Sequence, residues 1–362
     1  MSNTNELIVI LNEVIQKYIR EYFNVYTVDP ILSESPATLA SNDIVNEVEP
    51  IRFENEVFAV DSSSRSITSA GGIISIVTLG VSSLSKPVFG AYPGLFGIKN
   101  IELNKPFVAL ASSSVSKGIN PYLYSSKYVT TVSLDGTPFQ SITDPERVET
   151  ELRAIIETEA LKKLKGFGTI IVDGPLFPSY TFLPEKVKKT IINERLKVLD
   201  SSYIGVVKRL DKSDLLVKSL ASKAKDIYSK YKVDPRGFIS DEAFLFQLVR
   251  FNFNPPYPVL SVGPLIKEIT QGVKIYVNYL VYPIHKYVPK FSFLRIESFT
   301  RDAINKIVSL KFTLDGIPTV LAIADKTAKE LSSGILRYIA FSLDRIGLQE
   351  SFRGKFEVLS VV

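Results

Sequence analysis

Two aspartates stand where apolar runs of the sequence end. Residues 57–60 are apolar and are followed by Asp61 and three serines, and residues 169–172 are apolar and are followed by Asp173. Runs that are apolar on both faces predict buried, central strands. A carboxylate at the tip of such a strand either shapes its own turn or has a cationic partner. The recurrence of the pattern favours the cationic partner.

Two further acids belong to predicted helices. A helix over residues 145–165 precedes the second strand and carries Glu149, Glu151, Glu157 and Glu159; its distance from Asp173 and its place in the helical pattern favour Glu151. Asp325 lies near the start of a helix expected over residues 319–343. Four carboxylates from four elements are typical of an RNase H-like nuclease. We therefore predict an α/β fold, an RNase H-like mixed sheet core flanked by helices, with inserted loops and an N-terminal helix.

Oxygen atoms are the main metal ligands that the side chains of this sequence can supply. It has no cysteine and one histidine, His285, which excludes thiolate and multi-histidine sites. We expect His285 to be a loop residue rather than a catalyst. Carboxylates suit Mn²⁺ or Mg²⁺, and two such ions about 3.5–4 Å apart can activate water and stabilise a leaving oxygen.

Composition and charge limit the remaining function classes. The 362 residues are 45% hydrophobic, which predicts an ordered protein, and the net charge of +5 permits a polyanionic partner. Basic helices expected over residues 183–200 and 214–232 are either solvated faces or a rim that follows phosphates. The scarcity of Met, Trp and Cys is typical of a thermophile. We find no export signal or membrane span and expect a cytoplasmic protein.

The pattern also predicts the chain's organisation. An N-terminal helix (7–23) and linker occupy residues 1–50, and one nuclease domain occupies residues 51–362, with insertions at about 85–128 and 235–275. The first strand is expected to end at Asp61 and to pair antiparallel with a strand over 71–80. Further strands are expected over residues 129–136, 203–210, 274–282 and 291–299.

Five short stretches resemble the NurA nuclease family, the archaeal DNA-end-processing partners of the HerA helicase-translocase. They are Phe58-Ala59-Val60-Asp61-Ser62-Ser63-Ser64-Arg65, Ile171-Val172-Asp173-Gly174-Pro175-Leu176, Gly205-Val206-Val207-Lys208, Arg295-Ile296-Glu297 and the segment 316–325, with Glu151 between the first two. The resemblance covers residues 55–345. It implies a 5′-to-3′ exonuclease with single-strand endonuclease activity, a homodimer docked on a hexameric HerA-like ATPase during resection of DNA breaks.

The resemblance and the acid pattern together give a set of site residues. We predict Asp61, Glu151, Asp173 and Asp325 as catalytic metal ligands, and Arg65, Lys208, Arg209, Lys212 and Arg295 as DNA contacts. The family's last motif usually has a tyrosine at Ile317 and a histidine at Asp325. These departures leave open a NurA-like protein that binds DNA or the ATPase without cutting. A third alternative is an RNA-directed nuclease.

Overall fold

A computed structural model describes residues 35–41, 43–69, 72–95, 97–112, 125–140, 145–180, 183–270 and 272–345. The helix predicted over residues 7–23 lies outside these ranges. The chain divides into two compact units: Met1–Leu39 with Arg209–Pro256, and Ala40–Lys208 with Tyr257–Val362. The predicted boundary at residue 50 and the two predicted insertions stay predictions.

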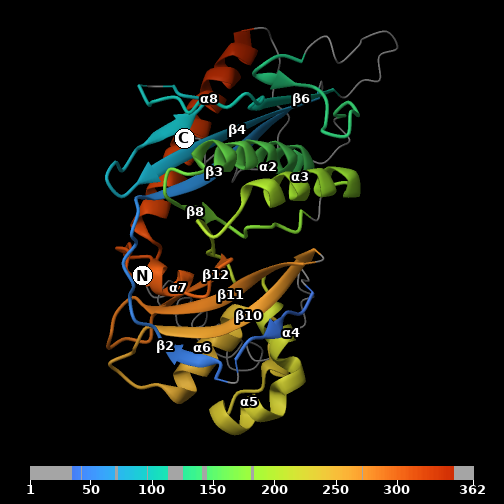
Figure 1. Cartoon of the computed structure of the whole chain (residues 1–362). Helices are drawn as coiled ribbons and strands as arrows, with labels where there is room; N and C mark the ends of the chain where they lie inside the picture. The colour runs from blue at the N-terminus through green and yellow to red at the C-terminus, as the bar shows by residue number, and fades with distance from the viewer. Residues whose placement is uncertain are drawn as a thin grey trace, which may run out of the picture. The chain divides into compact units, whose positions relative to one another are not determined.

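A mixed sheet forms the core of the larger unit (Figure 1). Its strands follow the order β10 (Leu260–Thr270), β11 (Val273–Pro283), β12 (Phe291–Ser298), β9 (Tyr203–Val207), β8 (Thr169–Asp173), β3 (Val57–Ser69), β4 (Gly72–Ser83), β6 (Val108–Ser112) and β7 (Val129–Thr130). β2 (Val45–Glu47) pairs with β10, and β5 (Gly90–Tyr92) pairs with β4. β3, β8 and β9 are mutually parallel neighbours, whereas β3, β4 and β6 are antiparallel. The predicted α/β class, with a mixed sheet flanked by helices, is confirmed.

Strand β3 is longer than its apolar run. The antiparallel pairing with β4 is as predicted, but the expectation that the strand ends at Asp61 is wrong, because pairing continues to Ser69. The serines that suggested a turn have partners on a helix instead. Ser62 donates to Glu157 at 2.5 Å and Ser64 donates to Glu149 at 2.7 Å.

Helices cover both faces of β3 and β4, as Figure 1 shows. Helices α2 (Pro145–Leu164) and α3 (Glu185–Val198) cover one face, and α8 (Thr319–Arg345) covers the other, where the short α7 (Ala303–Val308) shares a core cluster with it. Side chains alternate along a strand: Ser62 and Ser64 reach α2, while Ser63 bonds Ser332 of α8 at 3.0 Å. The helices predicted over 145–165 and 319–343 are thus confirmed.

The smaller unit contains the short strand β1 (Thr38–Leu39), the helices α4 (Leu215–Leu220), α5 (Ala224–Tyr231) and α6 (Asp241–Asn252), and the 3₁₀ turns η2 (Ala221–Lys223) and η3 (Pro235–Gly237). The single helix predicted over residues 214–232 is wrong, because η2 separates α4 from α5. Helix α4 buries nearly all its residues, whereas α5 buries one face. Asp241 accepts hydrogen bonds from the backbone N–H of Leu216 and Val217 and so holds the start of α4. Among the described helices of the whole chain, none is long and apolar enough to cross a membrane.

Candidate metal and catalytic site

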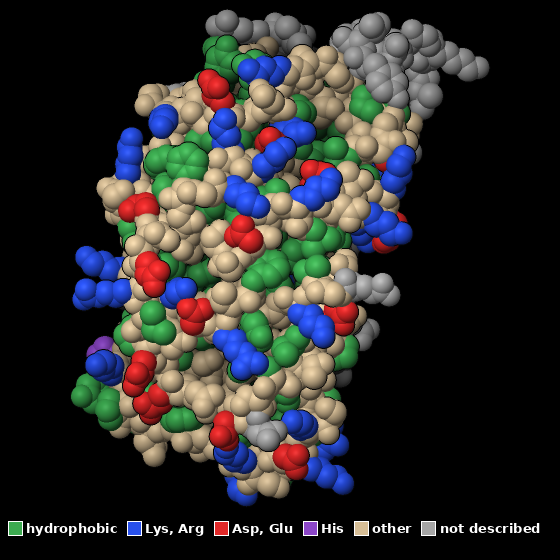
Figure 2. Space-filling view, in the orientation of Figure 1, with side chains coloured by type: hydrophobic (Ala, Val, Ile, Leu, Met, Phe, Trp, Pro, Cys, Tyr) green, Lys and Arg blue, Asp and Glu red, His purple; other side chains and the backbone are tan. Residues whose placement is uncertain are grey.

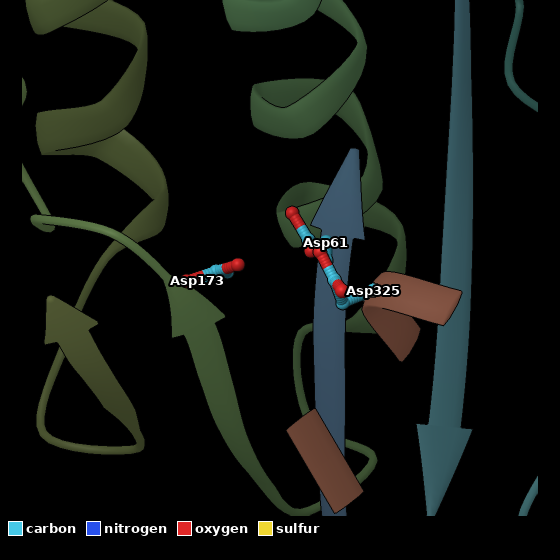
Figure 3. A group of neighbouring side chains, drawn as sticks. All are labelled: Asp61, Asp173 and Asp325. Carbon is cyan, nitrogen blue, oxygen red and sulfur yellow. The ribbon is translucent and has the colours of Figure 1, made fainter. Parts of the chain in front are cut away.

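Three aspartates meet at one edge of the parallel strands. Asp61 of β3, Asp173 at the end of β8 and Asp325 in α8 each offer a carboxylate oxygen, and these oxygens all lie within 4.8 Å of one another. Figure 3 shows the side chains of Asp61 and Asp325 beside each other, with Asp173 reaching toward them from the neighbouring strand. Asp61 is buried, with 5% of its surface exposed. The other two are partly exposed, so the group opens to solvent on their side.

The strand register places the first two acids. Val60 of β3 lies opposite Val172 of β8 in the parallel ladder, so the next residue of each strand is an aspartate at the same edge. The apolar runs before them are buried: Ala59 and Ile171 belong to one core cluster, which also includes Ala324 of α8. Burial of these runs therefore holds Asp61 and Asp173 next to the hydrophobic core.

Strand β4 places the third acid by holding α8. Thr78 donates to the carbonyl oxygen of Ala328 at 2.7 Å, and Ser82 donates to that of Val320 at 2.5 Å. Between them, Gly80 faces the carbonyl oxygen of Ala324. The three contacting residues of β4 are two apart in sequence and therefore lie on one face of the strand. The three contacting residues of α8 are four apart and therefore lie on one side of the helix. This contact brings the residue after Ala324, which is Asp325, over β3.

Two lysines already neutralise part of the acidic group. The Nζ atom of Lys208, just beyond β9, lies 2.5 Å from Oδ2 of Asp173 and 3.9 Å from Oδ1 of Asp325. The Nζ atom of Lys329, one turn after Asp325, lies 2.8 Å from its Oδ2. Burial lowers the pKa of Lys208, but Asp173 and the other two carboxylates outweigh that effect and raise it. Lys208 is therefore charged at neutral pH.

The acids have unequal proton affinities. Burial, followed by the charge of Asp173, raises the pKa of Asp61 well above its ordinary value. Burial also acts to raise the pKa of Asp325, but hydrogen bonds from Asp61 and Lys329 lower it overall. Within this hydrogen-bonded pair, Asp61 therefore holds a proton more tightly than Asp325 does. Close carboxylates share protons in this way when no cation separates them.

The donor set fits a hard divalent cation. Three carboxylates from three elements supply oxygen ligands only, as Mn²⁺ and Mg²⁺ prefer. Burial, and after it repulsion from Asp173, raises the pKa of Asp61, and a bound cation would oppose both effects.

The structure does not bring Glu151 into this group. Its buried carboxylate accepts hydrogen bonds from the hydroxyl of Ser133 at 2.8 Å and from the backbone N–H of Leu134 at 2.6 Å. Helix α2 covers the face of β3 opposite α8, so its acids meet the serines on that face rather than Asp61. The helical period correctly placed Glu151 on a buried face, but it could not indicate which side of the sheet that face would meet.

The predicted DNA contacts lie in different environments. Arg65 donates to Ser332 of α8 at 3.3 Å and is partly exposed. Arg295 is buried, and its guanidinium lies 3.1 Å from Glu297, which makes it a poor candidate for a phosphate contact. Arg209 and Lys212 are exposed residues of the smaller unit, and Arg209 pairs with Asp211 at 3.5 Å. His285 lies in the exposed loop between β11 and β12.

Sequence reasoning missed Arg153 and Lys329. The Nε atom of Arg153 donates to Ser62 at 3.1 Å. Burial lowers the pKa of Arg153, but nearby carboxylates, including Glu157, Asp61 and Asp173, raise it overall, which places this cation near the acidic group. The sequence did contain a sign of both cations, because each has an acid four residues away in a predicted helix, a spacing that allows an ion pair. The pairs are Arg153 with Glu157 and Lys329 with Asp325.

Surface charge gives little further guidance. On the face shown in Figure 2, Lys and Arg side chains are interspersed with Asp and Glu side chains rather than gathered into one stripe. The charge pattern on this face therefore does not decide whether the basic helices form a phosphate-binding rim or simply face solvent.

Comparison with known proteins complements this geometry. Solved structures that match the chain include the NurA nuclease from Sulfolobus solfataricus, at 12% sequence identity and a TM-score of 0.47; the match covers 95% of this chain and 98% of that chain. They also include a NurA structure with manganese, at 10% identity and a TM-score of 0.35, which covers 93% of this chain and 98% of that chain. The catalytic domain of human Endonuclease V matches at 13% identity and a TM-score of 0.33, covering 90% of this chain and 98% of that chain. A search of curated proteins gave no match. The family model of the NurA domain matches residues 55–330, and the chain therefore belongs to the NurA family.

Proposed function

We propose that this protein is a metal-dependent DNA nuclease whose Mn²⁺ or Mg²⁺ is held by Asp61, Asp173 and Asp325. The observation that carries the proposal is the convergence of these three carboxylates beside Lys208, at the C-terminal end of β8. Membership of the NurA family supports DNA as the substrate.

Each residue of the site has a task in phosphodiester hydrolysis. A divalent ion held here would polarise the phosphate and lower the pKa of an attacking water. Asp61, Asp173 and Asp325 would hold the ion, and its positive charge would favour the ionised form of Asp61, whose pKa burial raises. Lys208, charged and partly exposed, donates hydrogen bonds to a phosphate oxygen and so orients the scissile bond.

The finer assignments follow from the family and belong to the same proposal. We propose 5′-to-3′ exonuclease and single-strand endonuclease activities, in the cytoplasm, during resection of DNA breaks. The partner would be a hexameric HerA-type ATPase, with the nuclease acting as a homodimer. Digestion of DNA labelled at either end, with and without such an ATPase, tests polarity and partnership.

A second candidate is a DNA-binding or ATPase-binding protein that does not cut. It is favoured by the engagement of Asp325 with Lys329 and Lys208, and by Ile317, whose side chain packs against the core and offers no hydroxyl. Cleavage of labelled single-stranded DNA at any Mn²⁺ concentration excludes it. A parallel assay with RNA of the same sequence tests for an RNA-directed enzyme.

The deciding experiment compares Asp61→Asn with Glu330→Gln. We expect Asp61→Asn to lower Mn²⁺-dependent cleavage at least about 100-fold, because an amide cannot replace a carboxylate at the most buried position of the group. Glu330 lies on the same helix as Asp325 and is 70% exposed, so Glu330→Gln should retain full activity. Equal cleavage by wild type and Asp61→Asn would exclude the assignment.

A further inference from the structure

The environment of Lys208 limits how many ions the site can take. Its ammonium lies 2.5 Å from Asp173 and 3.9 Å from Asp325, so it touches two of the three candidate ligands. Its side chain is 20% exposed, whereas that of Lys329, which touches only Asp325, is 60% exposed. Lys329 can leave its carboxylate for water at little cost, but Lys208 is held inside the group.

Charge balance favours a single ion. Three carboxylates carry three negative charges, which one divalent ion and one ammonium neutralise together. Two divalent ions beside Lys208 would give an excess of two positive charges before any phosphate arrives.

We propose that the ammonium of Lys208 takes the place of a second metal ion, so that the centre binds one divalent ion per chain. This inference rests on the proposed function and replaces its expectation of two ions. Asp61, Asp173 and Asp325 would hold that ion. The ammonium supplies the fixed positive charge that a second ion would otherwise place at the phosphate, and no proton transfer from it is required.

Mn²⁺ titration of the full chain without DNA tests the stoichiometry. Calorimetry and manganese EPR should give one ion for the wild type and for Lys208→Arg, which keeps the charge. Lys208→Met removes the charge and frees a carboxylate oxygen, so two ions should bind. Lys329→Met is the matched control: it removes a cation from the same group at an exposed position, and one ion should still bind.

Each outcome separates this inference from the proposed function. Two ions in the wild type, or one ion in Lys208→Met, overturns the role of Lys208. Loss of all binding in Asp61→Asn then still supports the metal site. If no variant binds Mn²⁺, both proposals fail. Should Lys208→Met not fold, the wild-type EPR spectrum decides: two ions a few ångströms apart give a spin-coupled spectrum, whereas one ion gives the uncoupled six-line spectrum that we expect.

Discussion

Gly80 lies opposite Asp61 in the β3–β4 ladder, and a Cβ atom on Gly80 would lie 2.4 Å from the carbonyl oxygen of Ala324. Only a residue without a side chain allows the helix backbone to approach the strand this closely. Because Asp325 follows Ala324, the same glycine that faces one acid of the candidate site determines how near the other acid can come.

Gly80→Ala should therefore loosen both the fold and the site. We expect a loss of about 1–3 kcal/mol in unfolding free energy, as for other overpacked positions, and a weaker affinity for Mn²⁺. Gly237→Ala is the control, since a Cβ there meets nothing within 4 Å; it should change stability by less than about 0.5 kcal/mol. Urea unfolding and Mn²⁺ titration measure the two effects. A Gly80→Ala protein with unchanged Mn²⁺ affinity would show that the close approach does not position Asp325.

The raised pKa of Asp61 predicts a stability that falls with pH when metal is removed. A carboxyl group whose folded pKa is raised contributes fully below its unfolded pKa of about 4, and loses that contribution as pH rises through the folded value. The lowered pKa of Asp325 has the opposite effect on stability, which rises with pH, but this effect is confined to pH values below about 4. In EDTA, unfolding free energy should thus fall between pH 4 and neutral pH.

The controls for this pH dependence are chemical and genetic. Saturating Mn²⁺ should remove the fall, because the cation compensates the charge that burial penalises. Asp61→Asn should remove it as well, since the amide does not titrate. The same fall in Asp61→Asn as in the wild type would assign the effect to another group. Chemical unfolding at a series of pH values provides the measurement.

Glu151 should act in stability rather than in metal binding. Glu151→Ala leaves the buried hydroxyl of Ser133 and the N–H of Leu134 without their acceptor, which costs about 1–3 kcal/mol. We expect the Mn²⁺ affinity to stay within about twofold. Glu159→Ala, on the same helix, should change stability by less than about 0.5 kcal/mol. A large loss of Mn²⁺ affinity at unchanged stability would restore Glu151 as a ligand.

Arg195 should be among the most sensitive positions in the larger unit. Its buried guanidinium donates to Glu157 at 2.9 Å and to the carbonyl oxygen of Leu176 at 2.8 Å, in the segment that follows Asp173. Arg195→Met leaves Glu157 without this partner, and we expect a loss of about 3–5 kcal/mol. Lys189→Met, at an exposed position of the same helix, should be nearly neutral. A difference below about 1 kcal/mol, measured by urea unfolding, would contradict this role.

Local patterns were sufficient for the elements that carry the acids. The apolar runs before Asp61 and Asp173 are short and buried on both faces, so both runs are visible in the sequence alone, although the continuation of β3 to Ser69 is not. The helix that carries Asp325 shows equally clear periodicity. Three of the four predicted acids come together for this reason, although their role as ligands stays a prediction.

What the sequence could not supply was the position of each element in three dimensions. The position of Glu151 outside the three-aspartate group could not be read from the sequence, because helical spacing gives a buried face but not the side of the sheet that it meets. The contact between Lys208 and Asp173 depends on β9 pairing with β8, which no local pattern specifies. The break at η2 arises because α4 is buried on nearly all sides and α5 is not, a difference of tertiary packing.

The three aspartates are far apart along the chain, and the last of them lies on the final helix that the structure describes. During synthesis, β3 and β8 can pair before α8 has been made, and Asp61 and Asp173 then stand together without a third carboxylate. A growing chain should consequently hold the divalent ion weakly until α8 docks on β4. Under the proposed function, the metal site is therefore complete only once the chain has folded through residue 325.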